Sequence, residues 1–120
     1  MDALETIWAK SRPEIETHWT RCEQGGLPHT AANRDRVIAA FEAFLTTLKG
    51  LPAGHSEQPV PDAIRVLYAA LDEVNVANGE GLLETDEREL LVPIIIEAAV
   101  AAGVNSANHD GEPGSEFRNF

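Results

Sequence analysis

The stretch ANRDRVIAAFEAFLTTLKG, residues 32–50, decides the fold class of this sequence. Its large apolar side chains recur at spacings of four, three and four residues, which is the period of one face of an α-helix. They are Val37, Phe41, Phe44 and Leu48, with Ile38 and Leu45 alongside. Asn33 or Thr30 can cap such a helix at its start, and Gly50 ends it. The stretch therefore predicts an amphipathic helix with one buried face.

The segment before this stretch has the same helical period and contains one proline. Leu4 and Ile15 are eleven residues apart, close to three helical turns, so they share a face. Pro13 interrupts the pattern, and Gly25 with Gly26 ends it. The segment predicts either one kinked helix or two short helices.

Two further helices are expected after a loop that is rich in proline and glycine. The first opens at Pro61 and has an apolar stripe along residues 64–74. The second starts near Thr85 or Asp86 and runs to about Gly103, with a kink at its internal proline. Its β-branched run has no second strand to pair with, and helix-forming residues flank it, so a helix is favoured there.

Together these segments predict an all-α protein, a compact antiparallel bundle of four helices, or of five if Pro13 breaks the first one. The length of 120 residues is typical of one domain with a single core. We assign that domain to residues 1–104. Residues 105–120 have no periodic pattern and are expected to form a flexible C-terminal tail.

The chain is acidic, with a formal net charge of −11 from 20 acidic and 9 basic residues. Such a surface repels nucleic acids and anionic membranes, and it attracts a basic protein partner at low salt. The single cysteine, Cys22, excludes an intrachain disulfide and fits a reducing compartment. The N-terminal residues carry acidic side chains and no sustained apolar run, so they do not read as a secretory signal. We expect a cytoplasmic protein that binds neither nucleic acid nor membranes.

The stretch VANGEGLLETDERE, residues 76–89, reads either as a metal loop or as a glycine turn before a capped helix. Aligned on Gly81, its oxygen-bearing side chains fall at the third, fifth, ninth and twelfth positions of a twelve-residue loop. They are Asn78, Glu80, Glu84 and Glu87. Over this one segment the chain resembles the EF-hand family, and the resemblance implies calcium as the ligand.

Other features of the same stretch favour the turn. Val76 occupies the first position, where the family has an aspartate, and no second loop is present for the usual pairing. Gly79 and Gly81 permit the backbone reversal, and Thr85 or Asp86 can cap the helix that follows. We therefore predict a turn and a cap with no cofactor, and calcium is the alternative.

His18 and Cys22 form a second candidate metal pair. They are four residues apart on one helical face, a spacing that can hold zinc. Two more ligands would have to come from elsewhere, and His29 and His55 are the candidates. However, Cys22 also continues an apolar stripe of the first helical segment, where a thiol packs as a small hydrophobe. On this pattern we predict core packing.

The last predicted helix is apolar on almost every side. Such a helix has to be enclosed by its own chain or covered by another one. We expect either that the first segment wraps over it, or that it forms a homodimer or partner interface. The interface residues would then be Val92, Ile96 and Val100. Glu97, within the same helix, is expected to reach solvent at its edge.

No motif specifies an enzyme, and no catalytic residue is predicted. Ser56 beside His55 lacks the surrounding glycines of a nucleophile elbow, and the sequence has no phosphate-binding glycine loop. Charge and size favour a protein-binding or regulatory module, of the inhibitor or immunity type, for a basic partner. One alternative is calcium binding by residues 76–87. The other is a small helical enzyme or ligand carrier, with Trp8, Trp19 and Tyr68 lining a pocket.

Overall fold

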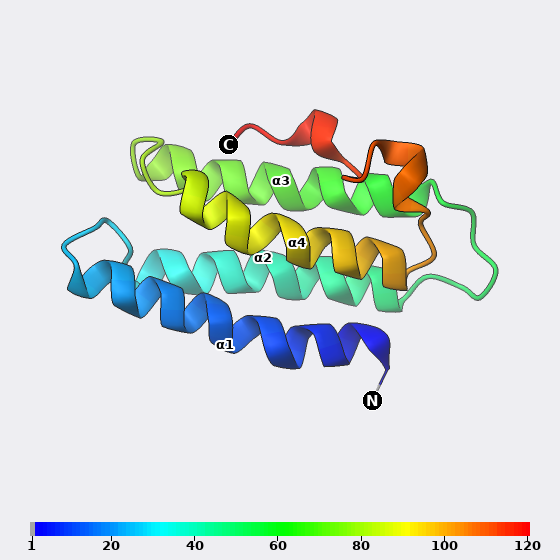
Figure 1. Ribbon diagram of the computed structural model, residues 1–120, viewed down its shortest axis with the longest axis horizontal. Coiled ribbons are helices and arrows are strands. Elements are labelled where there is room, and N and C mark those ends of the chain that lie inside the picture. The colour runs from blue at the N-terminus through cyan, green and yellow to red at the C-terminus, as the bar shows by residue number, and fades with distance from the viewer. Residues whose placement is uncertain (1) are drawn as a thin grey trace.

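A computed structural model of the chain, describing residues 2–120, consists of α-helices joined by loops (Figure 1). The four α-helices are α1 (Ala3–Gln24), α2 (Ala31–Lys49), α3 (Pro59–Ala77) and α4 (Thr85–Ala101). Two short 3-10 helices follow, η1 (Ser106–His109) and η2 (Ser115–Phe117). No strand occurs within the described residues. The predicted all-α bundle of four helices is confirmed.

The first helical segment is one helix, because α1 continues through Pro13 for 22 residues. The break that would have produced a fifth helix does not occur. Pro13 is exposed, while Ile15 and Trp19 are almost completely buried. Burying a large apolar side chain contributes about 2–3 kcal/mol, so these two together offset the roughly 3 kcal/mol that an internal proline costs.

The helices are arranged so that α1, α2 and α3 lie side by side, with α4 crossing in front of them (Figure 1). The main helix contacts are those of α2 with α3, α1 with α4 and α1 with α2. The packing of α1 along α4 agrees with the first of the two alternatives for the apolar fourth helix, and the interface stays a prediction. Glu97 reaches solvent, as expected. Although α4 is apolar, neither it nor any other helix of residues 2–120 combines the length and apolar character needed to cross a membrane.

Residues 105–120, for which a flexible tail was predicted, pass back over the bundle (Figure 1). In this segment η1 contacts α4 and η2 contacts α3. Phe117 and Phe120 pack against the core, and the ring of Phe120 meets that of Tyr68 edge-on at a centroid distance of 5.9 Å. The segment thus has a packing site on the domain, while its flexibility stays a prediction.

Candidate metal centre

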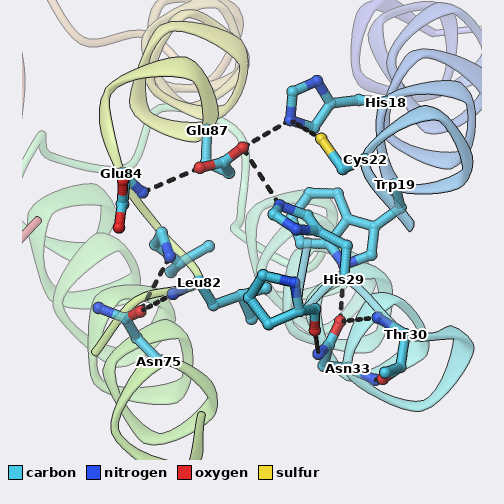
Figure 2. Close-up of polar contacts among 12 residues, drawn as sticks. His18, Trp19, Cys22, His29, Thr30, Asn33, Asn75, Leu82, Glu84 and Glu87 are labelled. Atoms are coloured by element: carbon cyan, nitrogen blue, oxygen red, sulfur yellow. Dashed lines mark hydrogen bonds and ion pairs between the residues drawn. The ribbon is translucent and has the colours of Figure 1, made fainter. Parts of the chain in front are cut away.

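Four side chains of the kinds that bind metal ions meet at one end of the bundle (Figure 2). His18 and Cys22 extend from α1, His29 from the loop between α1 and α2, and Glu87 from the first turn of α4. One potential ligand atom from each of them lies within 4.8 Å of all the others. Within residues 2–120 it is the one such group of histidine, cysteine and acidic side chains. We call it the His–Cys–Glu cluster.

The turn after α1 is what carries His29 back towards that helix. Gly26 has a φ of +84°, a left-handed conformation that glycine adopts without steric cost. The ring of His29 then packs edge-on against the ring of Trp19, with a centroid distance of 4.9 Å. The cluster therefore depends on a local reversal that brings His29 beside His18 and Cys22.

The side-chain amide of Asn33 fixes the loop between α1 and α2 by hydrogen bonds. Asn33 Oδ1 accepts a hydrogen bond of 2.7 Å from Trp19 Nε1 and one of 3.0 Å from the backbone N–H of Thr30. Asn33 Nδ2 donates to the carbonyl oxygen of Pro28 at 2.9 Å. These contacts fix the residues on both sides of His29 (Figure 2). Asn33 therefore positions the backbone on both sides of His29, and not the ring itself.

Glu87 is almost fully buried, at 4% exposure, and both of its oxygen atoms have partners. Its Oε1 atom accepts from the backbone N–H of Glu84 at 3.0 Å, which ties it to the start of α4. Its Oε2 atom lies 2.6 Å from His18 Nε2 and 3.2 Å from His29 Nε2. The residue that precedes α4 is Glu84, so the prediction of Thr85 or Asp86 as the cap is wrong by one or two positions.

These contacts decide the charge of Glu87. Burial raises the pKa of Glu87, but hydrogen bonds from His18, the Glu84 N–H and His29 outweigh burial and hold that pKa below 4.5. A carboxylate surrounded by three donors is therefore ionised at neutral pH. One full negative charge consequently faces two imidazole rings in a partly dry site.

The pKa of the Cys22 thiol is shifted in the opposite direction. Burial raises its pKa above 9.0, and the negative charges of Glu87 and Asp86 raise it further, against a smaller lowering by Arg21. The thiol is therefore protonated at neutral pH in the metal-free protein. Because the thiolate is the form that binds metals, an incoming ion has to displace this proton.

The spacing of the donor atoms is close to that of a four-coordinate site. A zinc ion with ligands at roughly 2.0–2.3 Å keeps its tetrahedral ligand atoms about 3.3–3.8 Å apart. Cys22 Sγ lies 3.4 Å from His18 Nε2, and His29 Nε2 lies 3.2 Å from Glu87 Oε2. The 2.6 Å contact between His18 and Glu87 is shorter than this, and every other separation is under 4.8 Å. Shifts of about 1 Å would convert the hydrogen-bonded cluster into a tetrahedral site.

His29 uses only one of its two ring nitrogens, Nε2, in the cluster. Its side chain is 3% exposed, and its Nδ1 atom has no hydrogen-bond partner among residues 2–120. A buried polar atom without a partner costs about 1–3 kcal/mol, and native proteins seldom leave one unless an ion or water completes the site. Because Nδ1 points to the opposite side of the ring from Nε2, it cannot bind the same ion, and the evidence for a metal site comes from the four clustered donor atoms.

The structure resolves the alternatives that the sequence left open for His18 and Cys22. It brings His29 to the pair, whereas His55 lies in the loop between α2 and α3, outside the cluster. The prediction that Cys22 is a core residue is wrong, because its side chain is only half-buried and its sulfur contacts His18. Glu87 was not expected here, since 69 residues separate it from His18 and no spacing rule connects them.

The residues of the candidate calcium loop are not gathered in the same way. Glu80 and Glu84 have exposed side chains, and the amide of Asn78 bonds to Asn33. Glu87 turns its carboxylate into the His–Cys–Glu cluster. Because one carboxylate cannot serve both sites, this arrangement favours the cluster, and calcium binding by residues 76–87 stays a prediction.

The other predicted positions lie apart from the cluster. Along the expected interface of α4, Val92 is buried, Ile96 is half-buried and Val100 is 49% exposed. Trp19 and Tyr68, considered above as pocket residues, are each 1% exposed and belong to the core. The interface stays a prediction, with Val100 as its exposed member.

Comparisons with models of known protein families, with curated proteins and with solved structures find no significant match to this chain. The geometry and donor chemistry of the His–Cys–Glu cluster are therefore the basis for assigning a function.

Proposed function

We propose that this chain is a small metal-binding module that holds one transition-metal ion of the zinc class in the His–Cys–Glu cluster. The observation that carries the proposal is the convergence of four donor atoms within 4.8 Å where α1, the α1–α2 loop and α4 meet. Imidazole and thiolate ligands favour zinc and related transition metals, whereas calcium and magnesium take oxygen ligands. One thiolate and one carboxylate would also balance the charge of a divalent ion.

The number of ligands favours a structural or regulatory ion over a catalytic one. Catalytic zinc sites keep one position for water or substrate, and four protein ligands would fill a tetrahedral shell. Glu87 and His29 are buried, while the side chain of His18 is 21% exposed, so an ion would enter from the α1 side. A bound ion would link α1 to α4 and stabilise the folded chain, because the unfolded chain has no assembled site.

Metal titration of the chelator-treated protein tests this proposal. We expect zinc to bind with one ion per chain and to raise the Tm. Cobalt(II) should bind in its place and give a thiolate charge-transfer band that the variant Cys22→Ser lacks. The variant His55→Ala, altered outside the cluster, should bind both ions as the parent does.

The outcomes separate the two candidate metal sites. A zinc-induced rise in Tm that is as large in Cys22→Ser as in the parent would contradict the proposal, as would the absence of any rise in the parent. A rise with calcium that is lost in Glu80→Gln would instead support the loop at residues 76–87.

The net charge of −11 supports a second proposal, that the chain acts as a protein-binding or regulatory module for a basic partner. Binding should then weaken as salt is added, because exposed charges are screened. Affinity capture at low and high salt tests this, and the absence of any basic partner at low salt would contradict it.

Light scattering of the parent and of Val100→Ser tests the homodimer.

A further inference from the structure

A groove with a volume of about 590 Å³ runs between α2 and α3. Its walls come only from these two helices and the loop that joins them, so the His–Cys–Glu cluster takes no part in it. Most of the lining is apolar: Ala40, Ala43, Phe44, Val66, Leu67 and Ala70. The alanines are too short to fill the space between the helices. The volume lies within the range of about 300–1,000 Å³ that is usual for small-molecule sites.

One apolar side chain in the wall of the groove is unusually exposed to water. Val66 is 67% exposed, the highest value among the large apolar side chains that are exposed on the described surface. Exposed apolar surface of this kind, inside a hollow of ligand size, marks binding sites more often than general surface does.

Polar groups gather at the loop end of the groove. They belong to Ser56, Gln58 and Asp62. Asp62 Oδ1 accepts from Gln58 Nε2 at 3.1 Å, and the guanidinium of Arg65 lies 4.0 Å away in an exposed pair, which is a weak interaction. The carboxylate therefore has capacity for another donor. An anionic group would meet both this carboxylate and the net charge of the chain.

We propose that this groove binds a small amphiphile, whose hydrocarbon body lies along the alanine-lined walls and whose hydrogen-bond-donating, non-anionic head lies beside Asp62. This proposal does not depend on the metal centre, because the two sites share no residue. A failure of one therefore leaves the other standing.

Calorimetric titration of the full chain tests the proposal with two probes, decylammonium and decyl sulfate, each kept below its micelle concentration. We expect saturable binding of one decylammonium per chain and binding of decyl sulfate that is at least about tenfold weaker, because of the charge at the polar end. Asp62→Asn should reduce this preference. Glu73→Gln, which removes one exposed charge from the same helix outside the groove, should leave it unchanged.

A second pair of variants locates the site. Ala70→Phe should fill the groove and weaken decylammonium binding at least about tenfold, while Ala69→Phe, at an exposed position outside the groove, should not. Because Ala70→Phe can disturb packing, Val66→Ser serves as a milder variant at an exposed position, with an expected loss of about fivefold.

Any one of four results would overturn the proposal. Three of them are the absence of saturable binding, equal binding of both probes, and binding that Ala70→Phe and Val66→Ser leave unchanged. Equal losses in Ala70→Phe and Ala69→Phe would also overturn it, because the effect would then not be specific to the groove.

Discussion

The carboxylate of Glu87 lies 2.6 Å from Nε2 of His18, although 69 residues separate the two in the sequence. This contact joins the first turn of α4 to α1, and the same oxygen atom reaches Nε2 of His29 at 3.2 Å. One buried charge therefore connects three segments of the chain. Its consequences for stability and for metal binding can be measured separately.

In the metal-free protein, replacing Glu87 by glutamine should lower the free energy of unfolding by about 2 kcal/mol at neutral pH, because hydrogen bonds to a charged group are lost. The folded-state pKa of Glu87 lies below 4.5, so its contribution is fully present above about pH 4.5 and is lost as the pH falls through the folded pKa. Parent and variant should therefore converge in strong acid. Urea unfolding across the acidic range checks this, and an equal loss in the exposed control Glu97→Gln would contradict it.

Zinc affinity should rise with pH, because the raised pKa of the Cys22 thiol means that binding releases its proton. We expect a gain of about tenfold per pH unit for one displaced proton, continuing up to the thiol pKa above 9.0. Competition with a chromophoric chelator at several pH values measures the slope. Cys22→Ser should flatten it, since serine has no proton to lose in this range. A slope that is the same in both proteins would show that Cys22 does not bind the ion.

The sequence predicts features that depend on neighbouring residues better than features that depend on contacts between distant segments. The period of Val37, Phe41 and Phe44 is local and sets a helix with a buried face, which the structure confirms. The interruption expected at Pro13 did not break α1, because the burial of Ile15 and Trp19 outweighs a local preference.

One half of the candidate site could likewise be predicted from local spacing, and the other half could not. His18 and Cys22 share a helical face through their spacing, and this half was visible in the sequence. The contact of His29 with Glu87 spans 58 residues and exists only after α1 and α4 pack together. Periodicity shows which face of a helix is buried, but not which helix it meets. A glutamate in the first turn of a helix also has a local explanation as a capping residue, which hid the role of Glu87.

Asn75 should be one of the most sensitive polar positions. Its buried Oδ1 atom accepts from the backbone N–H groups of Leu82 at 3.1 Å and Leu83 at 2.9 Å, in the turn that leads to Glu87. Asn75→Ala leaves two buried donors without a partner and should cost about 2–4 kcal/mol in the free energy of unfolding. Denaturant unfolding measures this, with the exposed Asn108→Ala as control. Asn75→Asp, which keeps the acceptor, should lose less, and a loss equal to that of alanine would contradict this account.

Gly114 should be required for the docking of residues 105–120. Gly114 and Gly111 both have left-handed backbones, with φ of +79° and +82°, so alanine is strained at either position. A Cβ atom at Gly114 would in addition overlap the side chain of Ile64, while one at Gly111 would meet open space. Gly114→Ala should therefore release the segment and speed its cleavage in limited proteolysis, well beyond the effect of Gly111→Ala. Equal cleavage of the two variants would contradict the packing seen against α3.

Tyr68 should titrate at an unusually high pH. Burial raises its pKa well above 10.0, the charge of Glu112 raises it further, and Arg118 partly opposes them. Because the folded state favours the neutral phenol, the contribution of Tyr68 to stability is fully present below about pH 10 and is lost as the pH rises beyond it. The chain has one tyrosine, so the ultraviolet absorbance of the phenolate reports on Tyr68 alone. Its hydroxyl has no hydrogen-bond partner among residues 2–120, so Tyr68→Phe should change stability by less than about 1 kcal/mol at neutral pH and remove the alkaline loss. Titration of the folded chain at the ordinary value, as expected for the chain in urea, would mean that the ring is not enclosed between α3 and the C-terminal segment.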